Sequence, residues 1–356
     1  MSGRDINPVR FPDTMKAVVY REFGGPEVLH CEEVATPQAG PDEVLVKVLA
    51  IAIDYIQLHI RRGGSGRIGS ARESSYGIAG PPYFPGGTAC VEVAALGTNA
   101  KGVELGSRHL VGGLRPGSCV EWAVVDAKAL QPRPDGRPGT TACPPSFTPE
   151  QVAAFGYAPV AYHTLKIAAG LKAGETVLLH AAAGGTGVLA IQLAKSFGAR
   201  VLATAGSPEK LDLTRELGAD LAINYRTDDF VAAVLEATSG RGVDVVWESV
   251  GGEVFTQSLN CMAEGGRMVS FGSNTFTGTG QVDFWPFWVK NLKLIGWGGS
   301  SNAEAHTPEI MEALIDLAQA DRLRPVVRHV YPFGDASSAH RLIEERLSIG
   351  KVLLRP

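Results

Sequence analysis

A run of small residues between an apolar strand pattern and a helix pattern is the strongest chemical signal in this sequence. The expected strand spans 176–181, the expected helix spans 188–198, and Ala and Gly fill most of the turn between them. Small residues let the backbone turn sharply and approach a pyrophosphate, which the N–H groups and positive dipole of the following helix then bind. A tight turn without a ligand would use the same residues, but this one opens a repeating series of strands and helices. We therefore expect a dinucleotide to be bound by Ala183, Gly184, Gly185, Thr186 and Gly187.

The elements that must position this turn form two groups along the chain. Up to about residue 160, short β-branched runs separated by Gly and Pro clusters predict an antiparallel, barrel-like domain. Beyond it, strand and helix patterns alternate, which predicts a doubly wound parallel sheet. A helix at 308–323 and a strand at 351–356 follow, and we expect the strand to rejoin the first domain. The further strands expected in the parallel sheet are 200–205, 221–225, 243–250, 266–272 and 292–297, and the further helices are 207–218, 228–240 and 253–264.

Composition excludes several classes of protein. The chain has 356 residues, of which 45% are hydrophobic and 20% charged, and its formal net charge is −4. That charge offers no electrostatic attraction to nucleic acid or to an anionic membrane. We find no apolar stretch of about 18 residues that would predict a membrane-spanning helix. The five cysteines are scattered without a CxxC pair, and the first residues lack the apolar core of a signal peptide, so we expect a cytoplasmic protein with reduced thiols.

Ordered motifs along nearly the whole chain resemble one superfamily. They include MKAVVYREFGGPEVL at 15–29, GSCVEWAVV at 117–125, the segment 161–210 and GKVLL at 350–354. The chain resembles the medium-chain dehydrogenase/reductase superfamily, in its branch of zinc-independent quinone oxidoreductases and enone reductases. The resemblance implies an α/β fold in which a Rossmann-type doubly wound parallel sheet is inserted into a β-rich, chaperonin-10-like catalytic domain. We expect a catalytic domain at 1–160 and 298–356 and a dinucleotide-binding domain at 161–297.

The residue at the end of the second strand predicts the cofactor. NAD-binding folds carry an acid about 20 residues beyond the fingerprint, where it accepts hydrogen bonds from the ribose. Comparison with the superfamily places Ala205 there, so a 2′-phosphate would meet no carboxylate. The next helix begins with an expected N-cap, and Lys210 follows one turn along. We expect NADPH, with its phosphate bound by Gly206, Ser207, Lys210 and Tyr225, the last by analogy with the quinone reductases.

Other cofactor neighbours are expected at the carboxyl ends of later strands, where open sheets bind ligands. We interpret Glu248, which precedes two of these residues, as structural. His163, His180 and His340 stand in no cluster, and we interpret them as core or surface residues. The remaining residues in the expected cofactor set are Ser249, Val250, Phe271, Gly272 and Lys351.

The resemblance also argues against zinc. Zinc alcohol dehydrogenases of this superfamily carry a Cys-His pair where this chain has Asp54 and Tyr55, and a Gly-His-Glu motif where it has Gly86, Gly87 and Thr88. The four-cysteine structural lobe is also missing from 101–108. Since a zinc site needs three protein ligands with suitable spacing, we expect no metal.

The segment 50–64 supplies the candidate catalytic residues. It lies where the family has G-x-N-P-x-D-x-Y-x-R-x-G, but the usual Asn is Asp54 and the usual Tyr is His59, while Arg61 is kept. Asp54 would hydrogen-bond near the nicotinamide ribose. Tyr55 and His59 are candidate donors to the enolate or quinol oxygen, with water as the alternative donor.

Three functions stay open at this stage. The first is an NADPH-dependent, metal-free reductase of quinones or α,β-unsaturated carbonyls. The second is an enoyl-thioester reductase, for which Arg61, Arg62, Arg67 and Arg72 offer a basic patch. The third is a catalytically silent NADPH-binding structural or sensor protein. The resemblance further implies a homodimer through the edge strand 291–297. Four aromatic residues just before that strand could form a pocket wall, a structural cluster or an interface: Phe284, Trp285, Phe287 and Trp288.

Overall fold

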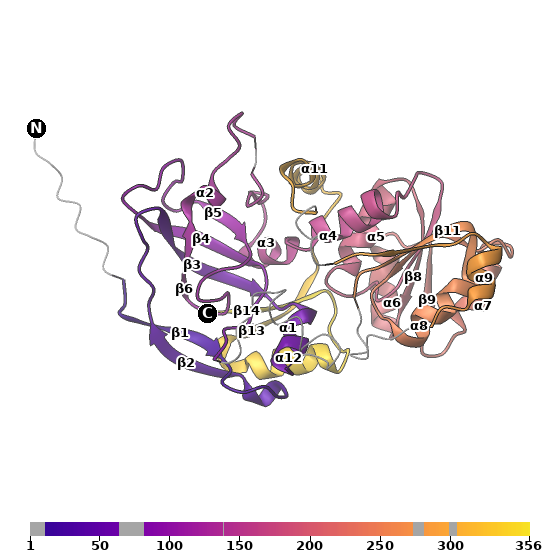
Figure 1. Ribbon diagram of the computed structural model, residues 1–356, viewed down its shortest axis with the longest axis horizontal. Coiled ribbons are helices and arrows are strands. Elements are labelled where there is room, and N and C mark those ends of the chain that lie inside the picture. Colours follow the sequence, from indigo (N-terminus) through magenta and orange to yellow (C-terminus); the bar gives the residue numbers. More distant parts are fainter. Residues whose placement is uncertain (1–10, 64–81, 138, 273–280, 299–304) are drawn as a thin grey trace, which may run out of the picture.

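Two six-stranded sheets divide the chain into two lobes that lie side by side along the long axis of the molecule (Figure 1). The computed structural model describes residues 11–63, 82–137, 139–272, 281–298 and 305–356. The first lobe is built from both ends of the chain, and the second is built from its middle. The predicted fold class, a parallel sheet inserted into a β-rich domain, is confirmed. The domain boundaries that we place at 160 and 297 stay a proposal.

The sheet of the first lobe has the order β13-β14-β3-β4-β5, and β6 pairs with β3. The C-terminal strand β14 lies antiparallel to β3, so it rejoins the first lobe as expected. Its other neighbour, β13, runs parallel to it and was not among the predicted strands. A separate antiparallel pair is formed by β1 and β2. The strands of this lobe are β1 Thr14–Val19, β2 His30–Ala35, β3 Glu43–Ala52, β4 Ala89–Leu96, β5 Arg108–Val111, β6 Trp122–Asp126, β13 Val327–Pro332 and β14 Lys351–Arg355.

The sheet of the second lobe has the order β12-β11-β10-β7-β8-β9, and every neighbouring pair is parallel. Its strands read as continuous apolar runs because helices cover both faces of such a sheet. The strands β8 and β9 follow on one side of β7, whereas β10, β11 and β12 follow on its other side, so the strand order switches between β7 and β10. Open sheets bind ligands at the carboxyl ends of the strands beside such a switch point. The strands are β7 Thr176–Leu179, β8 Arg200–Ala205, β9 Leu221–Asn224, β10 Val243–Glu248, β11 Met262–Ser270 and β12 Lys293–Gly296.

The helices of the second lobe follow the predicted alternation, except that one of them ends early and that α9 was not among the predicted helices. The predicted helix 253–264 ends early, because the chain leaves helical geometry after Cys261 and β11 begins at Met262. Met262 is buried beside Val243 of β10, and Gly265 then adopts a φ of 70° that a helix does not allow. The helices are α5 Gly187–Ser196, α6 Pro208–Glu216, α7 Phe230–Ala237, α8 Gly252–Ser258 with the 3-10 turn η3 Leu259–Cys261, and α9 Phe284–Val289.

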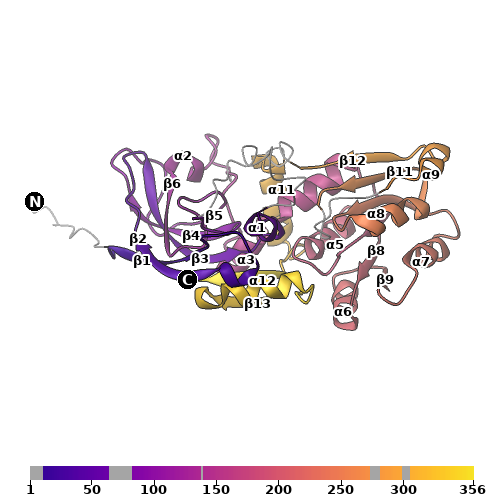
Figure 2. The same ribbon diagram turned by 60° about the horizontal axis from the view of Figure 1, so that its bottom comes forward.

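The remaining helices join the two lobes or cover the first. A cluster of buried apolar side chains runs from Ala50 and Leu110 in the first lobe to Val177 and Leu189 in the second. Between the lobes, α11 packs on α4 (Figure 1 and Figure 2). Among the described helices, none is long and apolar enough to cross a membrane. These elements are η1 Pro26–Val28, α1 Tyr55–Arg61, α2 Ala127–Leu130, α3 Pro149–Phe155, α4 Ala158–Tyr162, the π-helical turn η2 His163–Ala168, α11 Pro308–Gln319, η4 Phe333–Asp335 and α12 Ala336–Glu344.

Candidate active site

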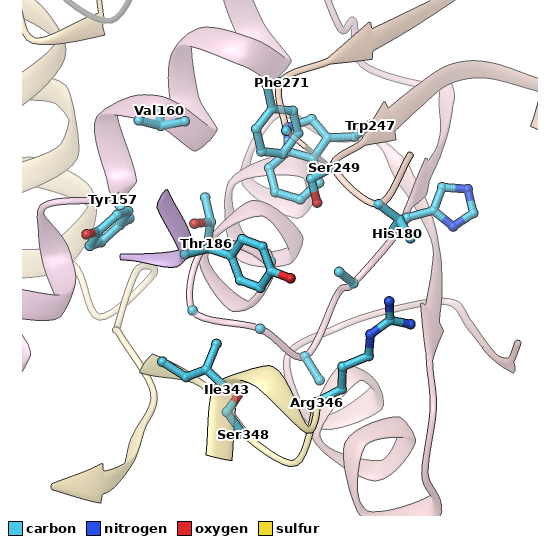
Figure 3. A pocket seen from close by; sticks show the side chains of 18 of the residues that line it. Tyr157, Val160, His180, Thr186, Trp247, Ser249, Phe271, Ile343, Arg346 and Ser348 are labelled. Carbon is cyan, nitrogen blue, oxygen red and sulfur yellow. The ribbon is translucent and has the colours of Figure 1, made fainter. Parts of the chain in front are cut away.

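A cavity of about 770 Å³ lies between the two lobes, at the carboxyl ends of the parallel strands. Figure 3 shows Tyr157 and Val160 at one side of it and His180 and Arg346 at the other. Every residue that the sequence predicts for the site lines this cavity, with the exception of Ser207. The structure therefore brings the expected cofactor and catalytic residues together, while the role of each stays a prediction.

The turn between β7 and α5 has the shape of a pyrophosphate cradle. A Cβ atom at Gly187 would lie only 2.5 Å from the carbonyl oxygen of Ala181, and one at Gly185 would lie 2.6 Å from the Lys351 side chain. Only glycine therefore allows this approach of backbone to backbone at position 187. The side chain of Thr186, at the N-cap of α5, makes no capping hydrogen bond, and the backbone N–H groups of the next residues bond instead to the carbonyl oxygens of Gly184 and Thr186.

The end of β8 leads into a group of basic side chains. Ala205 closes the strand, and a Cβ atom at Gly206 would lie 2.8 Å from the Tyr225 hydroxyl and 3.0 Å from Nε of Arg226. Lys210 lines the cavity close by, and burial together with the charge of Arg226 lowers the pKa of its ammonium. Mutual repulsion of cations is relieved by an anion, so these residues fit a phosphate group.

Ser207 takes the N-cap position that the sequence predicts, while its contact with a phosphate stays a prediction. It is the N-cap of α6, where its hydroxyl accepts a hydrogen bond from the backbone N–H of Lys210 at 3.4 Å. The predicted cap is therefore confirmed, but the residue lies outside the cavity lining. The hydroxyl therefore contacts its own helix.

The loop between α12 and β14 supplies site residues that the sequence did not reveal. Lys210 Nζ donates to the carbonyl oxygen of Arg346 at 2.6 Å, which ties this loop to α6. The side chain of Arg346 extends from the loop into the cavity (Figure 3). Ile343, near the end of α12, and Ser348, in the loop, line the cavity beside it. Their position just before the GKVLL motif was the one signal that could have pointed to them.

The carboxyl ends of β10 and β11 form another wall of the cavity. Ser249, Val250, Phe271 and Gly272 line it, and the Phe271 ring packs on Trp247 with centroids 4.3 Å apart. The interpretation of Glu248 as structural agrees with its contacts. Its buried carboxylate accepts hydrogen bonds at 2.6 Å from the backbone N–H groups of Val250 and Gly251, and so it shapes this turn.

The three candidate catalytic residues lie together at α1. Asp54 precedes the helix, and the rings of Tyr55 and His59 lie one turn apart with centroids 5.4 Å from each other. Burial raises the pKa of Tyr55 to about 12, so its phenol keeps its proton at neutral pH. Burial also raises the pKa of Asp54, while the ammonium of Lys351 at 3.4 Å opposes that rise.

Arg61 anchors this helix to α12. Its side chain is fully buried, donates to the carbonyl oxygen of Gly24 at 3.2 Å and contacts the carboxylate of Glu344. Its Nη1 lies 3.0 Å from Nδ1 of His340, whose pKa is lowered to about 3 by burial and by Arg61. The ring is therefore neutral and accepts the hydrogen bond. Arg62 also pairs with Glu344, so half of the expected basic patch is committed to structure.

Two further histidines are hydrogen-bonded inside the second lobe. His180 lines the cavity, and its ring nitrogens lie 3.0 Å from the Thr204 hydroxyl and 2.9 Å from the Ser258 hydroxyl. Burial lowers its pKa to about 3, so it is a neutral residue of the cavity wall. His163 accepts a hydrogen bond from the indole of Trp297. The interpretation as core residues holds for both, but His180 also belongs to the site.

The aromatic cluster of α9 does not form a wall of the cavity. Phe284, Trp285 and Trp288 are 74%, 69% and 70% exposed, and they are absent from the cavity lining. The pocket-wall interpretation is therefore wrong. Phe287 alone packs inward, against the apolar core of the second lobe. The helix lies next to β12 in the chain, at the edge of the sheet.

Asp54 and Gly87, which stand where the resemblance places zinc ligands, lie against each other. A Cβ atom at Gly87 would collide with both carboxylate oxygens of Asp54, so a larger residue at 87 would displace that side chain. Cys90 is buried in β4, and burial raises the pKa of its thiol to about 12. Within the described ranges, no three His, Cys, Asp or Glu side chains are grouped to hold a metal ion.

Comparison with known proteins gives consistent matches. The model "Zinc-binding dehydrogenase" matches residues 185–319, and "Alcohol dehydrogenase GroES-like domain" matches residues 40–135. A quinone oxidoreductase of Pseudomonas aeruginosa is 30% identical over 353 residues, which cover 96% of this chain and 99% of that protein. Quinone oxidoreductase 1 of Escherichia coli is 30% identical over 358 residues, with 95% and 99% covered. The crystal structure of Escherichia coli quinone oxidoreductase complexed with NADPH has a TM-score of 0.80 at 29% identity and covers 96% of this chain and 100% of its own.

These matches extend over both lobes, so they apply to the whole architecture that forms the cavity. The chain is an oxidoreductase that belongs to the medium-chain dehydrogenase/reductase superfamily, in its quinone oxidoreductase branch. The family resemblance that the sequence motifs predicted is confirmed.

Proposed function

We propose that this protein is an NADPH-dependent, metal-free reductase that transfers hydride to a quinone or an α,β-unsaturated carbonyl compound. The observation that carries the proposal is the cavity itself, which joins the glycine turn, the basic group at β8 and the donors of α1. The relative of known structure from Escherichia coli was crystallised with NADPH. Measuring NADPH consumption by the wild-type protein with a quinone, an enone and an enoyl thioester tests the proposal, which fails if neither the quinone nor the enone is reduced.

The residues of the cavity fit NADPH from end to end. The glycine turn at the start of α5 would hold the pyrophosphate, and Lys210, Tyr225 and Arg346 would surround the 2′-phosphate. Ser249 and Phe271, at the ends of β10 and β11, would border the nicotinamide. Bound NADPH supplies the hydride, while the protein supplies the position and orientation of the reactants.

The residues of α1 would act on the substrate oxygen. Charge grows on that oxygen as the neighbouring carbon is reduced, and hydrogen-bond donors placed beforehand stabilise it. Tyr55 can donate without losing its proton, because its pKa is raised to about 12 by burial. His59 lies beside it in the same wall.

We expect Tyr55→Phe and His59→Ala to slow reduction by about tenfold or more while NADPH affinity changes little, because both act on developing charge. Steady-state kinetics and NADPH titration of each variant check this. Unchanged turnover in both variants would leave the oxygen to water.

The enoyl-thioester alternative has lost part of its basis. It relied on a basic patch to bind a phosphate, but Arg61 is fully buried and Arg62 pairs with Glu344. Arg67 and Arg72 lie outside the described residues. The third possibility, a silent NADPH-binding protein, is separated from both reductases by the same substrate panel.

Activity should not depend on a metal. Since Asp54 fills the space beside Gly87, we expect active protein to contain far less than one zinc per chain and to keep full activity with a chelator. Elemental analysis of the assayed sample checks this. Stoichiometric zinc together with inactivation by the chelator would contradict it.

We further propose a homodimer that assembles in the cytoplasm through residues 291–297. The strand β12 is an edge strand of the second sheet, and unpaired edges favour pairing with another chain. The exposed Trp285 and Trp288 of α9 precede this strand and would be covered in part. We expect sedimentation at micromolar concentration to give a dimer, and a clean monomer would contradict the proposal.

A further inference from the structure

Lys351 is held where the two lobes meet. It opens β14 directly after Gly350, whose N–H donates to the carbonyl oxygen of Ala183 at 2.8 Å. Its aliphatic stem packs against Gly185, where a Cβ atom would lie 2.6 Å from Cδ. Its ammonium lies 3.2 Å from the ring centroid of Tyr157. A buried cation therefore lies between the glycine turn and the start of α1, and it lines the cavity.

Asp54 is turned toward this cation instead of toward its own helix. An Asp at an N-cap usually accepts a hydrogen bond from the second or third helical N–H. Asp54 occupies the N-cap of α1 but makes no such bond, and its Oδ1 lies 3.4 Å from Nζ of Lys351. The carboxylate fits there because Gly87 has no side chain. The pair is thus formed at the cost of a helix cap, which points to a use other than helix stability.

We propose that Lys351 donates the proton in the reduction and that Asp54 is the positioning residue that holds the ammonium and keeps it charged. The inference rests on the proposed function. When the β-carbon of an enone has gained hydride, the electrons of the C=C bond move to the oxygen. An N–H bond of Lys351 then breaks, the proton forms a new C–H or O–H bond, and Nζ is left as a neutral amine. Water returns the proton to Nζ through the open cavity before the next turnover.

The electrostatics of the pair support this assignment. Burial lowers the pKa of Lys351 to about 8, and the charge of Asp54 opposes this effect. A donor whose pKa lies near the working pH releases its proton more readily than Tyr55, whose pKa is about 12. Asp54 and Tyr157 contact the ammonium, and the glycine turn that packs on its aliphatic stem is uncharged. The other titratable or charged side chains that line the same cavity are Tyr55, His59, His180, Lys210, Tyr225 and Arg346.

Two substitutions separate proton donation from charge. Lys351→Arg keeps a cation but cannot release a proton at neutral pH, and Lys351→Met removes both. We expect both variants to lower kcat by about tenfold or more, because general acids contribute at least that much. The arginine variant should keep its NADPH affinity within about threefold. The control variant is Lys101→Met, on the surface of the first lobe, which should keep the wild-type kcat.

The pH profile provides a second readout. A donor must be protonated, so wild-type kcat should fall as the pH rises through the pKa of Lys351, and this fall should be absent from Lys351→Arg. Asp54→Asn removes the charge that favours the ammonium, so the fall should move to lower pH. The lysine side chains can also be titrated by NMR without cofactor, with the Lys351 signal assigned from its loss in Lys351→Met. The midpoint of Lys351 should be lower in Asp54→Asn than in the wild-type protein.

The outcomes are distinct for the two proposals. A wild-type protein that reduces neither a quinone nor an enone overturns the proposed function and this inference with it. If the wild-type protein reduces a quinone or an enone, and Lys351→Arg keeps both the wild-type kcat and its fall at high pH, only this inference is overturned. A Lys351 midpoint that does not move in Asp54→Asn would show that the pair is not coupled and would overturn the role of Asp54.

Discussion

Lys210→Ala is expected to weaken NADPH binding by about ten- to a hundredfold and to leave NADH binding nearly unchanged. Lys210 lines the cavity at the end of β8, where Tyr225 and Arg226 also lie. A charge-assisted hydrogen bond to a phosphate is worth about 1.5–3 kcal/mol, which corresponds to that loss of affinity. NADH has no 2′-phosphate, so it makes no contact that the substitution removes. Calorimetric titration with both cofactors measures the two effects in one preparation.

Lys210 also makes a hydrogen bond within the protein, and its loss could affect cofactor binding indirectly. Its ammonium donates to the carbonyl oxygen of Arg346, so its loss could loosen the loop before β14. That loop also borders the cavity, and a loosened loop would weaken both cofactors alike. Equal losses for NADPH and NADH would therefore contradict a phosphate contact. Lys101→Ala should change neither affinity.

Ala205→Asp is expected to reverse the cofactor preference, and this effect should be larger than that of Lys210→Ala. The new carboxylate would stand at the end of β8, where NAD-binding folds accept hydrogen bonds from the ribose. Two like charges about 4 Å apart near a protein surface repel by about 4 kcal/mol per pair of unit charges. Screening and the nearby cations reduce this value, and we expect NADPH affinity to fall by about a hundredfold. NADH affinity should stay the same or increase.

The matched control is Ala205→Asn, which has nearly the same size and no charge. Ala205 is 3% exposed, so any larger residue must be accommodated beside Tyr225, whose N–H donates to the Ala205 carbonyl oxygen at 3.3 Å. If Asn and Asp lower NADPH affinity equally, crowding rather than charge is responsible, and the argument from the missing acid is wrong.

Local patterns predicted most of the second lobe. The strand 176–179 and the helix α5 have continuous apolar residues on their buried faces, and the turn between them has few alternatives to glycine. The N-cap at Ser207 was equally local, since its hydroxyl bonds a residue three positions along. The end of α8 was missed because its apolar pattern continues into β11, where the sheet pairing of Met262 decides the structure.

Long-range contacts account for what the sequence could not reveal at the site. Arg346 reaches the cavity because α12 packs on α1, and the Arg61–Glu344 pair that joins these helices connects residues 283 positions apart. The turn of Asp54 toward Lys351 likewise depends on a glycine more than thirty positions away. The aromatic residues of α9 suggested a pocket wall by their composition, but three of the four are exposed on the surface.

The most direct test of the account compares turnover of the wild-type protein with NADPH and with NADH, at equal concentrations, with a quinone and with an enone as acceptors. The account predicts reduction of at least one acceptor, with NADPH used about tenfold faster or more than NADH at concentrations below saturation. No reduction of either acceptor, or a preference for NADH, would contradict it.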